Sequence, residues 1–476
     1  MSTVGMRAML RDRTRLRLPD SLRDRSRLRL FLLLWAPMLA WWLALLPGGI
    51  SLDTLSSWGQ IVTGRWNNHH PAPFTAFVWL TSFDGTTPAT TSLAQTALMA
   101  ACLTALARAL IRAGAPARAM TLAAFALGAL PLLGAFSIVI WKDIPETALL
   151  LLLGAQCVHL ALDANAEAEA SQPHSTRRVA AFAATAFGVA LLRWNGGLTD
   201  VVAAAALWFG LSRRYLSRRQ RSVPVAALAL AGIAGFLVLE LIPKVFPVAP
   251  ATAVDSNAQQ LADIGQFAAH TPGAFTRYDK ELIDPIATFR QWKDAGHHSC
   301  ASINPVIIAL IDERGKVAVA TSLMPKLDAL WRRLALARPD QLLRAHLCRS
   351  NLAWLPIDPY LKEGVITVFP HVQSNGFGLH SQGIPALRRV ARSYANVSKN
   401  RIVQDLLWRP ALWFLALALL AWRVHRRTGT KRMVATMLAV PLGVLASYVV
   451  YPAAQDARYC YAAVVLCQLG VVTYAY

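Results

Sequence analysis

Residues 30–54, LFLLLWAPMLAWWLALLPGGISLDT, form an apolar run that ends in a glycine turn and an aspartate. The run from about Leu30 to Leu46 approaches the ~20 residues that an α-helix needs to cross a bilayer. Asp53 follows it by only a few residues and is therefore expected at the membrane–water boundary. A carboxylate there can act on a lipid-borne substrate or simply mark where the helix leaves the bilayer, and both interpretations stay open at this point.

Similar apolar segments recur along the 476-residue chain, which is 55% hydrophobic. We expect an all-α polytopic membrane protein with about ten transmembrane helices. The expected spans are about residues 30–46, 93–111, 120–140, 147–162, 179–192, 199–211, 224–242, 411–422, 433–450 and 460–476.

The formal net charge of +22 comes largely from basic residues clustered between the apolar segments. This clustering is typical of cytoplasmic loops, which are enriched in Lys and Arg, and it excludes nucleic acid as the expected partner. Residues 1–29 then form a cytoplasmic basic arm that could contact anionic membrane lipids. The Ala- and Arg-rich composition favours a bacterial cytoplasmic (inner) membrane.

The predicted topology places the polar loops on the periplasmic or extracellular side. The first outer loop covers residues 48–92, within a transmembrane region of residues 30–245. Residues 246–408 are more polar and predict an extracytoplasmic domain of mixed or mainly helical structure, with fair helical periodicity from Thr321 to Leu347. Residues 409–476 form the C-terminal transmembrane region. Cys300 and Cys348 both fall in the polar region and predict either a disulfide bond or two free thiols.

Six charged residues lie within a few positions of an outer span end. They are Asp53, Lys142, Asp143, Arg193, Asp456 and Arg458. Cations at this depth would hold a phosphate, and a carboxylate would act as base on an incoming hydroxyl. The alternative is that these groups are interfacial anchors paired with one another in salt bridges.

His69 and His70 are adjacent, so their side chains point in different directions and predict substrate contacts or a structural role more readily than a metal site. No zinc-type spacing, nucleotide-binding glycine pattern or other cofactor motif occurs in the sequence. Trp194 could stack on a sugar ring or anchor the chain at the interface. The sequence therefore indicates no certain cofactor.

Four short motifs resemble the GT-C superfamily of integral-membrane glycosyltransferases, most closely a group of poorly characterised bacterial membrane proteins. They are Asn68-His69-His70-Pro71, Trp141-Lys142-Asp143-Ile144-Pro145, Leu192-Arg193-Trp194-Asn195-Gly196 and Asp456-Ala457-Arg458-Tyr459, together with Leu52-Asp53 after the first span. The likeness covers about residues 30–245 and the last seventy residues. Many relatives carry a second acidic residue where Thr54 follows Asp53. This difference leaves a requirement for a divalent metal open.

The resemblance implies inverting transfer of a sugar from a polyprenyl-phosphate donor to a lipid- or polymer-linked acceptor of the cell envelope, such as lipopolysaccharide. It makes Asp53 the catalytic base and places Lys142, Arg193 and Arg458 on the donor phosphate. Substrate-binding or supporting roles go to Asp143, His69, His70, Trp194, Asn195, Asp456 and Tyr459.

Three rival functions remain. A ligase or polymerase of lipid-linked glycans would share this plan and use arginines of the outer region to grip a diphosphate, for which Arg277, Arg290, Arg332 and Arg333 are candidates. A transporter or flippase would place ionisable residues inside spans and show internal repeats, and the sequence favours it less. A non-enzymatic scaffold would leave the outer charges without a purpose.

Overall fold

The computed structural model describes residues 20–170, 176–210, 218–357, 371–398, 400–428 and 431–475. Within these ranges the chain is helical, and its only β-type pairings are isolated bridges. The prediction of an all-α protein is therefore confirmed. Hydrogen bonds made within each helix satisfy the backbone where water is absent, which is what a membrane-spanning chain requires.

Each of the ten expected spans overlaps a helix, although the helix at the third span, expected at about residues 120–140, ends at Ala129. These helices are α2 (Asp20–Ala44), α5 (Pro88–Arg112), α6 (Ala117–Ala129), α8 (Asp143–Ala170), α9 (Thr176–Leu192), α10 (Gly196–Gly210), α11 (Arg218–Val245), α22 (Pro410–Thr428), α23 (Lys431–Val450) and α24 (Tyr461–Tyr474). By length and apolar composition, six helices of the described chain can cross a membrane. A seventh span results if α21 (Arg401–Trp408) and α22, which meet at 52°, count as one. Helices α6 and α10 are apolar but shorter.

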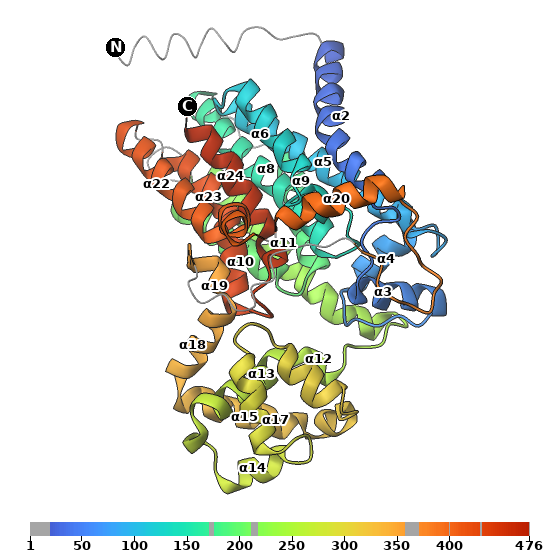
Figure 1. Cartoon of the computed structure of the whole chain (residues 1–476). Helices are drawn as coiled ribbons and strands as arrows, with labels where there is room; N and C mark the ends of the chain where they lie inside the picture. The colour runs from blue at the N-terminus through green and yellow to red at the C-terminus, as the bar shows by residue number, and fades with distance from the viewer. Residues whose placement is uncertain are drawn as a thin grey trace.

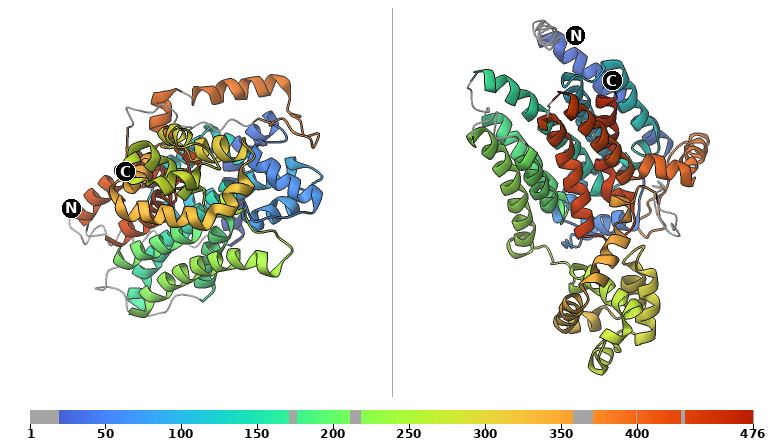
Figure 2. Two further views of the ribbon diagram at one scale, coloured as in Figure 1. Left: turned by 90° about the horizontal axis from the view of Figure 1, so that it is seen from below. Right: turned by 90° about the vertical axis from the view of Figure 1, so that its left-hand side faces the viewer.

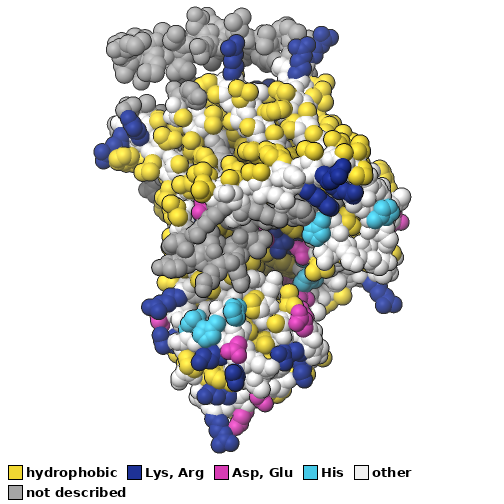
Figure 3. Space-filling model, viewed as in Figure 1, with side chains coloured by type: hydrophobic (Ala, Val, Ile, Leu, Met, Phe, Trp, Pro, Cys, Tyr) yellow, Lys and Arg dark blue, Asp and Glu magenta, His cyan; other side chains and the backbone are white. Residues whose placement is uncertain are grey.

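The ten helices form one bundle with two distinct ends (Figures 1 and 2). Helix α2 begins and α24 finishes at the inner end, whereas a second helical body lies beyond the outer end. Apolar side chains cover much of the bundle surface seen in Figure 3. The alternating chain directions place the loops after residues 46, 140, 192, 245 and 450 together at the end nearer the second body, which we call the outer end after the predicted topology.

Small residues let the helices of the bundle approach closely. A Cβ added to Gly443 of α23 would lie 2.4 Å from the carbonyl oxygen of Thr199 in α10. One added to Gly235 of α11 would lie 2.5 Å from Cβ of Ala190 in α9. Van der Waals packing of this kind is the main attraction between helices in lipid, because burial from water is not available there.

The first outer loop folds into two short helices, α3 (Leu52–Thr63) and α4 (Ala72–Thr81). Ser51 and Thr54 form a reciprocal capping box at the start of α3, so Asp53 falls in its first turn, where the helix dipole favours a negative charge. Trp58 and Phe74 are buried in a small apolar cluster that anchors both helices to the end of the bundle. The local sequence Ser51–Thr54 therefore fixes the position of the Asp53 carboxylate at the start of α3.

A second body, here called the outer domain, comprises helices α12 to α18 (Figure 1). They are α12 (Ala253–Ser256), α13 (Ala258–His270), α14 (Arg277–Ile283), α15 (Phe289–His298), α16 (Asn304–Val306), α17 (Val317–Ala337) and α18 (Pro339–Arg349), with short turns η1 (Pro272–Ala274) and η2 (Ile307–Asp312). It has its own apolar core, which includes Phe267 and the fully buried Trp292. The helical periodicity expected from Thr321 to Leu347 is interrupted before Pro339, which starts α18.

The expected extracytoplasmic region is not a single body. Helix α19 (Asn351–Trp354) follows the outer domain, and α20 (Pro385–Val397) lies across the bundle (Figure 1). The Trp41 ring of α2 stacks on Tyr394 of α20, with 5.7 Å between centroids. Residues 371–408 are therefore tied to the bundle, while α12–α18 form the outer domain.

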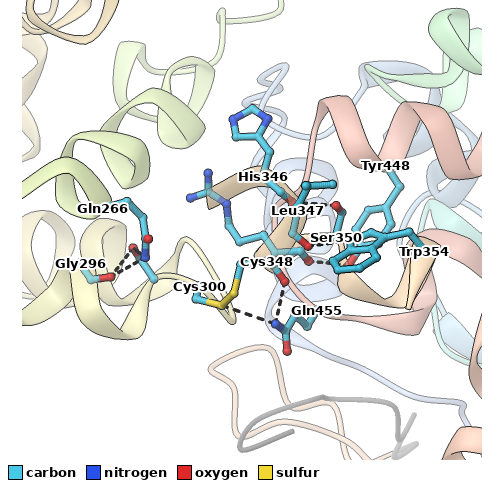
Figure 4. The surroundings of a disulfide bond; sticks show 12 residues. Gln266, Gly296, Cys300, His346, Leu347, Cys348, Ser350, Trp354, Tyr448 and Gln455 are labelled. Atoms are coloured by element: carbon cyan, nitrogen blue, oxygen red, sulfur yellow. Dashed lines mark hydrogen bonds between the residues drawn. A yellow bond between two sulfur atoms is a disulfide. The ribbon is translucent and has the colours of Figure 1, made fainter. Parts of the chain in front are cut away.

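Hydrogen bonds from Gln455 join the outer domain to the loop before α24, next to a disulfide bond within that domain (Figure 4). Cys300 and Cys348 form a disulfide bond across a Cα–Cα distance of 5.5 Å. Nε2 of Gln455 donates to the carbonyl oxygen of Cys348 at 2.8 Å, and its backbone N–H donates to that of Ala301 at 2.7 Å. The junction fixes the start of the segment that carries Asp456 and Arg458.

A buried ionic network stabilises the outer domain next to this junction. Asp263 accepts from Nε1 of Trp331 at 3.1 Å, lies 3.2 Å from Nε2 of His346, and pairs with Arg349. Both Asp263 and Arg349 are fully buried. A charge in such a place is tolerated only while its partner is present.

We predict that Asp263→Ala lowers the free energy of unfolding by about 3–5 kcal/mol, because it leaves the Arg349 guanidinium buried without its counter-ion. The measurement is thermal unfolding of the detergent-solubilised protein. The matched control is Asp328→Ala, which removes the exposed pair with Arg332 and should cost at most about 1 kcal/mol. Equal losses in the two variants would contradict a structural role for the buried pair.

Candidate functional site

Charged side chains from four separate segments converge at the outer end of the bundle. They come from α3, from residues 68–70 before α4, from the start of α8, and from the turn η3 (Ala457–Cys460) before α24. Figure 3 shows the surface hollowed between the bundle and the outer domain, with basic, acidic and histidine side chains around the hollow. The predicted site residues from distant segments are thereby brought together.

The central contact is the ion pair between Asp53 and Arg458, with 3.0 Å between Oδ2 and Nη1. Asp456 holds Arg458 from the other side, at 3.0 Å from Nε, and its Oδ1 accepts the backbone N–H of Arg458 at 2.9 Å. The Trp141 and Tyr459 rings each lie 5.0 Å from the guanidinium carbon. Arg458 is thus held in place while its side chain remains 20% exposed.

A second cation approaches Asp53 through His70. Nζ of Lys142 lies 3.3 Å from Nδ1 of His70, and Nε2 of His70 lies 3.9 Å from Oδ1 of Asp53. Beside them, Oδ1 of Asn68 accepts the N–H of Ala72 at 3.0 Å, which starts α4 and fixes the position of the histidine pair. Because an ammonium group can only donate, Nδ1 of His70 is the acceptor and its proton is on Nε2.

These charges control the protonation of Asp53 and His70. Burial by itself would raise the pKa of Asp53, but the positive charges of Arg458 and Lys142 outweigh it and hold this pKa below its ordinary value. Burial lowers the pKa of His70 to about 3, and the Lys142 charge acts in the same direction. At neutral pH the site therefore holds an ionised Asp53 beside a neutral His70.

Arg193 forms a separate, more deeply buried cluster. Its Nη1 lies 3.4 Å from Oδ1 of Asp143 and 3.1 Å from Oε2 of Glu146. Tyr459 connects the two clusters, since its ring lies 4.6 Å from the Arg193 guanidinium and its hydroxyl accepts from Nη2 of Arg458 at 3.0 Å. Only 10% of the Arg193 side chain is exposed, so it is less accessible than Arg458.

Three predicted residues lie outside these two clusters. The His69 ring packs edge-on against that of His70, with 4.6 Å between centroids, and its Nδ1 pairs with Oδ2 of Asp255 in the outer domain at 3.0 Å. Asn195 donates to Oγ of Ser447 at 3.4 Å, which links α10 to α23. Trp194, the residue after Arg193, is partly exposed. The histidine pair is therefore divided between the charged cluster and the outer domain.

Sequence reasoning missed Glu146 and Asp200 and named Trp141 only within a motif, whereas the structure makes all three prominent. Glu146 is three positions after Asp143, a spacing that places both carboxylates on one helix face. Trp141 donates to Oγ of Ser51 at 2.6 Å and covers Arg458. Asp200 is fully buried in α10, and a carboxylate inside an apolar segment is by default a functional candidate.

No group of three His, Cys, Asp or Glu side chains that could hold a metal ion is found among the residues that the structure describes. The carboxylates of the site instead face cations supplied by the chain, namely Arg458, Lys142 and Arg193. Because these three cations already face the carboxylates of Asp53, Asp143, Glu146 and Asp456, an added anion would bind by replacing one of these carboxylates at a cation.

No protein-family profile matches the chain, and no curated protein does. Among solved structures, it is similar to the crystal structure of ArnT from Cupriavidus metallidurans bound to undecaprenyl phosphate. That likeness has a TM-score of 0.34 and 15% sequence identity, and covers 93% of this chain and 77% of that one. From so remote a likeness we carry over neither site residues nor substrates, and the proposals below rest on the geometry of this chain.

Proposed function

We propose that this protein is a membrane glycosyltransferase of the GT-C type, which moves a sugar from a polyprenyl-phosphate donor to a cell-envelope acceptor at the outer end of the bundle. The observation that carries the proposal is the Asp53–Arg458 pair, with Lys142 close by, at the boundary between apolar helices and the outer hollow. A phosphate attached to a membrane lipid reaches this depth, and a carboxylate and two cations are the groups its transfer chemistry needs.

Arg458 and Lys142 are the proposed donor-phosphate ligands, because both are partly exposed. As the sugar–phosphate bond breaks, negative charge grows on the departing phosphate, and fixed cations stabilise it. Arg193 can join them only by exchanging Asp143 or Glu146 for the phosphate. In the structure, Arg193 pairs with Asp143 and packs against the Tyr459 ring, and so stabilises the shape of the site.

Asp53 is the proposed base for the acceptor hydroxyl. While Arg458 neutralises it, Asp53 is a weak base, since its pKa is held low. A phosphate that binds Arg458 shares that positive charge, so the pKa of Asp53 rises when the donor arrives. In this way donor binding would activate the base only when a sugar is ready for transfer. The proposed step forms one bond from the acceptor oxygen to the sugar carbon, breaks the sugar–phosphate bond, and inverts the carbon.

The outer domain is proposed to cover the site and shape acceptor choice. His69 of the first loop pairs with Asp255 at the start of this domain, and Asn68 pairs its backbone with Ala249. Together with the hydrogen bonds that Gln455 donates to Cys348 and Ala301, these contacts attach the domain to the bundle at two places.

The glycan ligase is the second candidate function, and the geometry favours it less. Arg277 pairs with Glu281, Arg332 with Asp328, and Arg333 with Asp279, all within the outer domain. Helix α14, which carries Arg277, lies at the end of that domain farthest from the bundle (Figure 1). These arginines are therefore engaged away from the charged cluster.

We predict that Asp53→Asn lowers the transfer rate by about 10²–10⁴-fold, the usual contribution of a positioned base. The assay follows sugar transfer from radiolabelled polyprenyl-phosphate sugars to crude envelope acceptor in liposomes. The control is Asp84→Asn, which changes an exposed carboxylate of the same loop that accepts from Trp79. It should retain wild-type activity.

Equal rates for wild type and Asp53→Asn would shift the base to Asp143 or Asp456. Absence of turnover with every monophosphate donor, in wild-type protein shown to be folded, would overturn the proposed function in favour of the ligase or a transporter.

The pH dependence provides a second test. Because the pKa of Asp53 is lowered and that of His70 is about 3, both groups keep one protonation state above about pH 5. We predict that kcat/KM for the donor shows no acid limb between pH 5 and 8. An acid limb centred near the ordinary histidine value that persists in Glu146→Gln, which removes the other carboxylate beside Arg193, would contradict this assignment.

Arg458→Gln should move the acid limb upward as well as weaken donor binding. It removes the nearest charge that lowers the pKa of Asp53 and leaves the burial that raises it. The acid limb of kcat/KM should then enter the measurable range. A variant with a lower rate but an unchanged pH profile would show that Arg458 does not control Asp53.

A further inference from the structure

A cavity of about 600 Å³ opens between α2, α5 and α8 at the inner end of the bundle, opposite to the charged cluster. Its lining combines three arginines, a histidine and apolar side chains. The proposed transfer reaction makes no use of this cavity, so its composition calls for a separate explanation.

Each wall of the cavity is one helix face that changes from apolar to basic in the same direction. On α5 the lining residues run from Ala101 and Ala105 to Arg108 and Arg112, the last at the inner end. Their spacing of three, four and seven residues places them on a single face.

The other two walls follow the same gradient. On α8 the lining runs from Leu152 through Gln156 to His159. Helix α2 runs in the opposite direction and presents Arg27 first and Phe31 one turn deeper. All three helices therefore place cationic or polar groups at the inner end and apolar groups toward the middle of the bundle.

From this gradient we propose that the cavity is a binding site for one anionic phospholipid of the inner leaflet. The phosphate would lie among Arg27, Arg108 and Arg112, and the acyl chains along Phe31, Leu152 and Ala101. Ala101 and Arg112 are eleven residues apart and so ~17 Å along the helix, about half of the ~30 Å hydrocarbon thickness. This length matches one leaflet and exceeds what a free phosphate would need.

A general excess of basic residues at the inner end does not account for this arrangement. Arg108 lies one turn deeper than Arg112, is half-buried, and faces the cavity. Basic pockets between transmembrane helices are suited to anionic headgroups, whereas topology signals need only lie in loops.

The experiment measures lipid retained by the purified, full-length protein in detergent, by native mass spectrometry and titration with phosphatidylglycerol. Arg108→Gln/Arg112→Gln should weaken binding about 30-fold, since each arginine near a headgroup contributes roughly a factor of five. The matched control, Arg29→Gln/Arg118→Gln, removes the same charge from exposed inner-end residues outside the cavity and should bind as wild type does.

A second variant separates shape from charge. Ala101→Trp fills the apolar wall and leaves the arginines in place, so it should also displace the lipid while the melting temperature stays close to that of the control. Soluble glycerol phosphate, which has the headgroup but no chains, should not compete.

Three outcomes would overturn the proposal. These are equal loss of binding in both double variants, unchanged binding in Ala101→Trp, and effective competition by glycerol phosphate. The last would identify a small-anion site. Because lipid binding is measured without turnover, the result does not depend on the proposed transferase activity.

Discussion

The ion pair between Asp53 and Arg458 is the contact around which the outer end of this protein is organised, because it joins residues 405 positions apart. Neither partner could stay at this depth alone, since an isolated charge beside apolar helices is costly. Asp53 is set by the capping box that starts α3, and Arg458 by Asp456 and the two rings of Trp141 and Tyr459. Each support comes from a different part of the chain.

The outer domain contributes to this pair through hydrogen bonds and one ion pair. Cys348 and Ala301 of this domain accept hydrogen bonds from Gln455, and the next residue, Asp456, orients Arg458. On the other side of the hollow, His69 connects Asp255 to the loop that also carries His70. A change in the orientation of the domain would therefore shift the residues on both sides of the Asp53 carboxylate. This coupling is consistent with the proposed role of the domain in acceptor choice.

The two ends of the bundle handle charge in different ways. At the outer end, cations and carboxylates neutralise one another in pairs, which leaves a site that can exchange one internal anion for a phosphate. At the inner end, three arginines line one cavity beside apolar walls, which is the proposed place for an anionic lipid. The same bundle therefore offers distinct environments for two classes of lipid phosphate.

The sequence by itself determined the helical segments and the end of the bundle at which each polar loop lies. Both follow from local properties, namely the length of apolar runs and the distribution of basic residues between them. It also predicted which short motifs would supply the charged groups. Only the tertiary structure decided which partner each charged group has. His69 pairs with Asp255 of the outer domain, Glu146 pairs with Arg193, and Asp53 pairs with Arg458. Pairing depends on how helices from distant parts of the chain pack, and no local sequence pattern encodes which of these helices come into contact.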